Sequence, residues 1–169
     1  MKMNRKIVMS SLLSVGVALS LAAAPAYADE GHTHGKKQTV LGGNPASVKA
    51  IAKALQGYAK VVRVKDIEKM GLFLAGEQFS VVEGQHANWG WIDYRDNHLK
   101  PEFNSSHFKL LDYKITDVKV KAGKLLSYAI YKTHLEYEQD GVKKTNHGMA
   151  TAILERKGNG WLIRHIHSS

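Results

Sequence analysis

Apolar residues recur every three or four positions in the first part of the chain that has a regular pattern. Ser47 can cap a helix, and the apolar residues behind it are Val48, Ile51, Ala52, Leu55, Tyr58, Ala59 and Val62. This spacing predicts an amphipathic helix of about four turns, ending near Asp66. Asp66 can cap a second, shorter helix. The segment 91–103, WIDYRDNHLKPEF, predicts a short third helix that stops near Pro101.

After His107 the pattern changes to period two, which is typical of β-strands. Four such segments follow, over about 108–121, 124–138, 143–156 and 160–168. The turns between them contain glycine, and such turns are strong hairpin signals. One more strand is predicted at 79–82, followed by a loop at 84–91. The chain is therefore expected to be an α+β protein in which the leading helices cover one face of an antiparallel meander.

The first 28 residues have a different character. Basic residues precede an apolar run over 7–24, and Ala26-Tyr27-Ala28 is a small-x-small cleavage motif. This is the anatomy of a secretory signal peptide, whereas a membrane anchor would need a longer apolar run. We expect cleavage after Ala28, a periplasmic or secreted protein, and no membrane attachment afterwards. Polar, glycine-rich residues 29–46 predict a flexible lead-in, and residues 47–169 a single folded domain.

The amino-acid composition excludes several kinds of chemical group and partner. The chain has no cysteine, which excludes disulfide bonds, thiol nucleophiles and cysteine metal sites. Residues 29–169 carry 21 basic and 15 acidic residues, a formal charge of +6 that is spread along the chain. No nucleic acid partner is expected without a basic cluster. The nine histidines are unusually many for this length, and His32 and His34 form a pair in the lead-in that can bind copper, nickel or zinc weakly.

The order of elements, the middle motif WIDYRDNHLKPEF and the last strand GWLIRHIHSS together resemble a known family. Over about residues 45–169 the chain is similar to the SnoaL-like, DUF4440-type branch of the NTF2-like superfamily. The resemblance implies an NTF2-like cone, in which N-terminal helices pack in a strongly curved antiparallel sheet around a pocket, and commonly a homodimer packed through the sheets. The superfamily includes enzymes as well as binding and assembly domains, so the fold alone does not decide the function.

Two stretches offer candidate chemistry. In period two, Trp161, Ile163, His165 and His167 share one face of the last strand, and imidazoles on one face can converge on one metal ion or substrate. Tyr94 and His98 share a face of the middle helix, which we expect to roof the pocket near Glu83. The candidate metal ligands are His98, His165 and His167, and the candidate metal is a divalent zinc, copper or nickel ion.

The alternative for these residues is a hydrogen-bond network of glutamate, histidine, tyrosine and arginine that fixes the helix on the sheet. His134 lies in the alternating charged row Lys132-x-His134-x-Glu136-x-Glu138, which predicts an exposed face rather than a ligand. Adjacent strand pairing is expected to place His147 near one end of the sheet.

Three functions remain open from the sequence. The first is an exported domain that binds a small organic ligand or a metal ion in the cone. Its expected lining residues are Tyr58, Glu83, Trp89, Tyr94, His98, His165 and His167. The second is an enzyme of lyase, isomerase or cyclase type, with His98 or His165 as general base and Glu83 or Asp93 orienting it. The third is a structural dimerisation module. The best-known enzyme relatives use an aspartate that is missing from the last strands here, so no catalytic residue is assigned.

Overall fold

The computed structural model describes residues 40–169, and the predicted signal peptide lies outside this range. The predicted lead-in lies inside it only from residue 40 onward, where the short strand β1 (Val40–Gly42) precedes helix α1 (Pro45–Arg63). Within the described residues, no helix is long and apolar enough to cross a membrane. Regular structure in the described residues therefore begins a few residues earlier than the sequence pattern predicts.

Helix α1 confirms the predicted amphipathic helix, but it begins at a different residue. Its cap is Asn44, whose side chain accepts hydrogen bonds from the backbone N–H of Ala46 at 2.9 Å and of Ser47 at 3.2 Å. Pro45 follows at the first helical position, where its missing N–H costs nothing. The prediction of Ser47 as the cap is wrong, because a better acceptor lies three residues earlier. The buried residues of α1 are Val48, Ile51, Leu55, Tyr58 and Ala59.

The second predicted helix is confirmed as α2 (Ile67–Gly71). Its cap is Asp66, as expected, and Oδ1 of Asp66 accepts a hydrogen bond from the backbone N–H of Lys69 at 3.1 Å. A single 3-10 turn, η1 (Gly76–Gln78), leads from α2 into the sheet. These short elements carry Met70 and Leu74 into the core.

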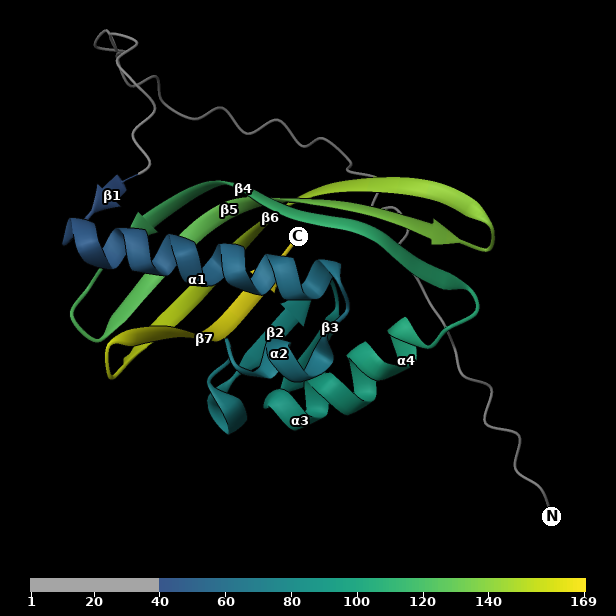
Figure 1. Ribbon diagram of the computed structural model, residues 1–169, viewed down its shortest axis with the longest axis horizontal. Helices are drawn as coiled ribbons and strands as arrows, with labels where there is room; N and C mark the ends of the chain where they lie inside the picture. Colours follow the sequence, from purple (N-terminus) through teal and green to yellow (C-terminus); the bar gives the residue numbers. More distant parts are fainter. Residues whose placement is uncertain (1–39) are drawn as a thin grey trace, which may run out of the picture. The chain divides into compact units, whose positions relative to one another are not determined.

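The sheet has seven strands in the order β1-β4-β5-β6-β7-β2-β3. The predicted meander is confirmed as β4 (Phe108–Lys121), β5 (Leu126–Gln139), β6 (Val142–Lys157) and β7 (Gly160–Ser168). Strand β2 (Ser80–Glu83) pairs in parallel with β7, and β1 pairs in parallel with β4, so the sheet is mixed rather than purely antiparallel. The fold is a curved sheet with helices on one face, which is the NTF2-like architecture expected from the sequence (Figure 1).

Residues predicted as a loop at 84–91 contain a further strand, β3 (His86–Trp89), at the edge of the sheet. Glu83 pairs with His86 across a two-residue turn that begins with Gly84 at a φ of 60°. Tight hairpins need residues with positive φ, and glycine accepts this without strain. The short segment has little alternation of its own, so the loop prediction is wrong there.

The middle motif forms one helical stretch of three parts. It consists of α3 (Trp91–Tyr94), a π-helical turn η2 (Arg95–Leu99) and α4 (Lys100–Phe103). The stretch covers 91–103, as predicted, and continues through Pro101 to end at Phe103. A proline has no N–H to donate, and its ring crowds the preceding turn of an α-helix. Here the turn that precedes Pro101 is the wider π-helical turn η2, which lessens this crowding.

Helix α1 lies across the sheet and contacts β4 and β7 (Figure 1). Gln56 on α1 donates from Nε2 to the carbonyl oxygen of Ile115 on β4 at 2.9 Å, which fixes the helix along that strand. We call the face under α1 the inner face and the other the outer face. The largest fully buried side chains form the core between α1 and the inner face: Tyr131, Phe79, Ile51, Leu55, Met70, Leu154, Ile163, Val81 and Val120.

A β-bulge in β7 overturns the predicted alternation of the last strand. Leu154 pairs with Ile163, but the next residue of β6, Ile153, pairs with His165, so Arg164 is an extra residue. A bulge shifts every following side chain to the other face. Ile163 and Ile166 are therefore both buried on the inner face. His165 and His167 do not share a face with Ile163, and the prediction that they aim into the cone is wrong.

Candidate functional site

The end of β2 and the middle helical stretch bring an imidazole and two carboxylates together. Nε2 of His98 lies 3.2 Å from Oε2 of Glu83 and 3.1 Å from Oε2 of Glu102. Glu83 is on the inner face, because Val81, two residues earlier on β2, is buried there beside Ile166. The side chains of the imidazole and the two carboxylates are partly exposed, by 24% for His98, 37% for Glu83 and 35% for Glu102. We call these three residues the acid–histidine cluster, and solvent can reach it.

The other ring nitrogen of His98 is held by β3. Nδ1 of His98 lies 3.2 Å from Oδ1 of Asn88. Asn88 is itself oriented by Asp93, because Nδ2 of Asn88 donates to Oδ2 of Asp93 at 3.2 Å. Asp93 also accepts from the backbone N–H of Trp89 at 2.8 Å and from Nδ2 of Asn97 at 2.8 Å. These hydrogen bonds, that from Asn97 most strongly, lower the pKa of Asp93 and keep it ionised.

The cluster favours a charged imidazole. Burial alone would lower the pKa of His98, but the hydrogen bond to Glu102 and the charges of Glu83, Glu102 and Asp93 outweigh it and raise the pKa. Burial raises the pKa of Glu83, although the charge of His98 acts in the opposite direction. Both ring nitrogens of His98 therefore act as donors, Nδ1 to Asn88 and Nε2 to the two carboxylates. An imidazole used in this way has no free lone pair for a metal ion.

Tyrosine side chains line the inside of the cone next to the cluster. The rings of Tyr94 and His98 lie 5.1 Å apart between centroids, and Tyr94 also packs against Phe79 at 5.6 Å. The hydroxyl of Tyr94 hydrogen-bonds to that of Tyr58 on α1. Burial raises the pKa values of a group of four tyrosines, so their hydroxyls stay neutral: Tyr58, Tyr94, Tyr113 and Tyr131. The charge of Glu83 acts in the same direction on each.

The structure brings together four of the residues that the sequence analysis selects, namely Tyr58, Glu83, Tyr94 and His98. Arg95 does not join the network and pairs with Asp96 at 2.8 Å instead. Trp89 does not line the cone, because it lies on the edge strand β3 with 74% of its surface exposed. An edge strand with no neighbour beyond it leaves such a side chain in solvent.

The two histidines of β7 lie away from the cluster. Nδ1 of His165 is 2.9 Å from the Ser80 hydroxyl, and burial, with the neighbouring His167, lowers the pKa of His165. His167 is exposed. His98 contacts Glu83 of the inner face, whereas His165 and His167 are on the outer face, so the three predicted metal ligands do not converge. Among residues 40–169 there is no group of three or more histidine and acidic side chains that could hold a metal ion.

Two residues of the site are absent from the sequence-based selection. Glu102 follows His98 by four residues, and that spacing places two side chains on the same face of a helix. It is a signal that can be recognised in the sequence. Asn88 offers no such signal, because its role depends on strand β3 and on the orientation that Asp93 imposes.

The acid–histidine cluster can accept hydrogen bonds from a ligand and can transfer a proton. The two carboxylates provide acceptors that solvent can reach, and His98 provides a charged donor between them. The neighbouring hydroxyls of Tyr58 and Tyr94 are buried in the core. A carboxylate with a raised pKa next to a charged imidazole is also a usual pair for proton transfer near neutral pH. The geometry alone is compatible with ligand binding and with acid–base chemistry.

Comparison with known proteins agrees with this architecture. A protein of the NTF2-like superfamily from Salmonella enterica has a similar structure, with a TM-score of 0.63 and 17% identity, over 72% of this chain and 88% of that one. An NTF2-like protein of unknown function from Shewanella oneidensis gives a TM-score of 0.58 and 21% identity, over 72% of this chain and 97% of that one. A protein of Streptomyces avermitilis is described provisionally as a dehydratase of the NTF2-like family. It gives a TM-score of 0.62 and 16% identity, over 73% of this chain and 95% of that one.

These similarities show that the chain has the NTF2-like fold. The SnoaL-like domain family matches residues 51–169, which is most of the chain, and the protein belongs to that family. No curated protein matches its sequence.

Proposed function

We propose that this protein is an exported domain that binds a small organic ligand at the mouth of its cone. The observation that carries the proposal is the acid–histidine cluster, in which His98 lies within 3.2 Å of both Glu83 and Glu102 while all three side chains stay partly exposed. The three side chains pair with one another and stay within reach of solvent, so a ligand can contact them directly. The ring of Tyr94 packs beneath His98.

The cluster favours a ligand that carries hydrogen-bond donors. Two carboxylates share a single imidazolium, so acceptors outnumber donors at the mouth. An amine or a hydroxyl group would donate to Glu83 or Glu102. We propose a small hydroxylated or amine-bearing molecule as the ligand class.

Nuclear magnetic resonance can test this proposal. The labelled protein is titrated with a panel of small aromatic amines and phenols, and backbone shifts are followed. We expect changes centred on Glu83, Tyr94 and His98, which the Glu83→Gln and His98→Gln variants lose. His107→Gln is the matched control, because His107 is an exposed histidine that pairs with Asp140 elsewhere. Shift changes that avoid the cluster, or that persist in both variants, would refute the proposal.

A catalytic role is the second candidate for the same site. In it, Glu83 would remove a proton next to a carbonyl group and His98 would stabilise the negative charge that develops. The raised pKa of Glu83 and the structural similarity to the Streptomyces avermitilis protein support it. Exchange of such protons in heavy water, measured on a panel of small ketones, should be faster with the protein than with Glu83→Gln. Equal rates would leave binding as the only role.

Self-association through the outer face is a separate proposal. Apolar side chains stay exposed there on neighbouring strands, namely Tyr128 on β5 and Met149 and Ile153 on β6. Covering them in a homodimer would remove this surface from water. Sedimentation velocity should show a dimer for the wild type and a monomer for Ile153→Glu, which places a charge at the centre of the patch.

The proposal that the protein is exported rests on its first 28 residues. We propose that they direct the chain across the membrane and are removed after Ala28, on the sequence motifs alone. Mass spectrometry of the protein from the periplasmic fraction should find Asp29 as its first residue. Retention of the full chain in the cytoplasm would contradict this.

A further inference from the structure

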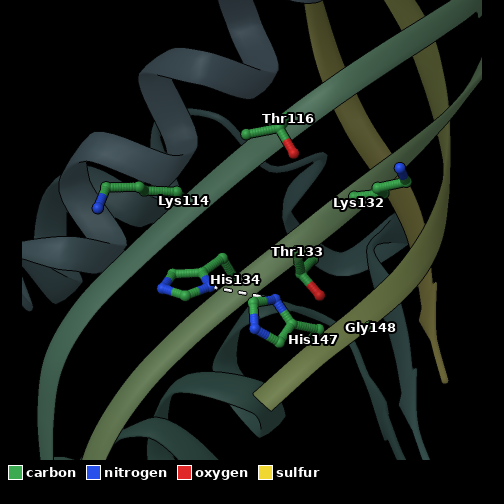
Figure 2. A pocket seen from close by; sticks show the side chains of 7 residues that line it. All are labelled: Lys114, Thr116, Lys132, Thr133, His134, His147 and Gly148. Atoms are coloured by element: carbon green, nitrogen blue, oxygen red, sulfur yellow. Dashed lines mark hydrogen bonds between the residues drawn. The ribbon is translucent and has the colours of Figure 1, made fainter. Parts of the chain in front are cut away.

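The outer face of the sheet carries a second group of histidines, apart from the acid–histidine cluster. His134 on β5 and His147 on β6 are cross-strand partners, and their ring centroids lie 4.6 Å apart. Nδ1 of His134 is 3.2 Å from Nδ1 of His147. Figure 2 shows the two rings turned toward each other from neighbouring strands. They line a shallow hollow of about 380 Å³, which is completed by Lys114, Thr116, Lys132, Thr133 and Gly148.

Glu136 orients the ring of His134. Its Oε1 atom lies 2.8 Å from Nε2 of His134, and a carboxylate there favours the tautomer in which Nε2 carries the proton. In that tautomer the lone pair of Nδ1 of His134 faces Nδ1 of His147. Such a carboxylate–histidine pair is the arrangement that orients a histidine toward a metal ion in known metal sites.

The distance between the two nitrogens matches a metal site. Ring nitrogens bind zinc at about 2.0–2.1 Å, so two of them on one tetrahedral ion are about 3.3 Å apart. The observed separation is 3.2 Å. An ion bonded to both nitrogens would stand to one side of the line that joins them, so the two rings would turn toward it while the strands keep their places. The hollow in front of the rings leaves room for water to complete the coordination.

Two lysines line the hollow, and acidic side chains offset part of their charge. Nζ of Lys132 lies 2.8 Å from Oδ2 of Asp117. Lys114 shares Asp112 with Arg63, whose Nε lies 2.9 Å from Oδ1 of Asp112. In the described part of the chain, no third histidine or acidic side chain is placed to bind the same ion. The ion would therefore have two protein ligands, and its other coordination positions would be open.

We propose that His134 and His147 bind one divalent transition-metal ion through their Nδ1 atoms, with Glu136 orienting His134. The spacing of the two nitrogens is that of a tetrahedral zinc site, whereas the general affinity order of divalent metals favours copper. Cu²⁺ is therefore the probe ion, because it combines high affinity for imidazole with a spectroscopic signal. This site is independent of the ligand site at the cone. It also differs from the metal site predicted from the sequence, in which His98, His165 and His167 were the ligands and His134 was discounted.

Calorimetric titration with Cu²⁺ tests the proposal. The full chain carries His32→Ala and His34→Ala in every sample, because that pair is a predicted competitor. At about pH 7.5 imidazole is neutral, and we expect one ion per chain. His134→Ala and His147→Ala should each weaken binding at least about tenfold, since each removes one of two ligands. His107→Ala and His98→Gln should bind as the background protein does, which separates this site from the one at the cone.

Electron paramagnetic resonance of the copper complex gives a second, direct readout. The background protein should show coupling to two imidazole nitrogens, and each single variant to one. Absence of binding in the background protein, coupling to fewer than two nitrogens, or unchanged affinity in both His134→Ala and His147→Ala would overturn the proposal. Circular dichroism of each variant verifies that the sheet is intact.

Discussion

Oε2 of Glu83 lies 3.2 Å from Nε2 of His98, and this contact joins the end of strand β2 to the π-helical turn η2. It couples a position in the sheet to the helical stretch that borders the mouth of the cone. Because His98 also reaches Glu102 at 3.1 Å, the protonation of one imidazole affects both the local fold and the proposed ligand site.

Stability should fall as pH rises through the pKa of His98. The folded state raises this pKa, so it binds the proton more tightly than the unfolded chain does. The stabilisation is therefore complete below the ordinary histidine pKa of about 6.5 and is lost as pH rises through the higher folded value. Glu83, whose folded pKa is also raised, acts with the same sign at lower pH.

Urea unfolding between about pH 6 and pH 8 measures this effect. The midpoint of the wild type should decrease with pH more steeply than that of His98→Gln. Parallel profiles for the wild type and His98→Gln would show that the two carboxylates do not favour the imidazolium.

The buried face of α1 should dominate the stability of the domain. Leu55 is fully buried in the core, with an exposed fraction of 0%. Leu55→Ala should lower the free energy of unfolding by about 2–5 kcal/mol, because it removes buried apolar groups and leaves a cavity. Leu72, which is 73% exposed, is the matched control. Leu72→Ala should change stability by about 0.5 kcal/mol or less in the same urea experiment.

The start of α1 gives a test of the capping residue. Asn44→Ala removes the acceptor for the backbone N–H groups of Ala46 and Ser47, and it should cost about 1 kcal/mol. Ser47→Ala should cost less, because Ser47 lies inside the helix and its side chain caps nothing there. Thermal unfolding of the two variants compares them directly. A larger loss in Ser47→Ala would restore the sequence-based assignment.

Regular elements could be predicted because their periodicity is local. The spacing of Ile51, Leu55 and Tyr58 identifies α1, and the alternation after His107 identifies the meander. The bulge at Arg164 has no comparable signal. It depends on how β7 pairs with β6, and a single inserted residue moves His165 and His167 to the outer face.

Part of the candidate site could also be predicted from local spacing in the sequence. Tyr94 and His98 share a helical face, which the four-residue spacing shows, and Glu83 ends the strand beside them. The cross-strand pair of His134 and His147 depends on the register between two strands. From the sequence, His134 lies only in an alternating charged row, and nothing local indicates that the two rings meet.

Copper should stabilise the folded protein through the His134–His147 pair, and Glu136 should control how strongly. A ligand that binds only the folded state at about 100 times its dissociation constant adds about 2.7 kcal/mol to the free energy of unfolding. The melting temperature of the protein that lacks His32 and His34 should therefore rise with Cu²⁺.

Glu136→Ala tests the orienting carboxylate. Losing such a partner typically weakens metal binding about 10–100-fold, so a higher Cu²⁺ concentration should be needed for the same rise in melting temperature. Glu138→Ala is the matched control, since Glu138 is two residues further along β5 and has no contact with His134 among the hydrogen bonds and ion pairs of the described residues. If the two variants require equal Cu²⁺, then Glu136 does not set the tautomer of His134, and the 2.8 Å contact between them is incidental to metal binding.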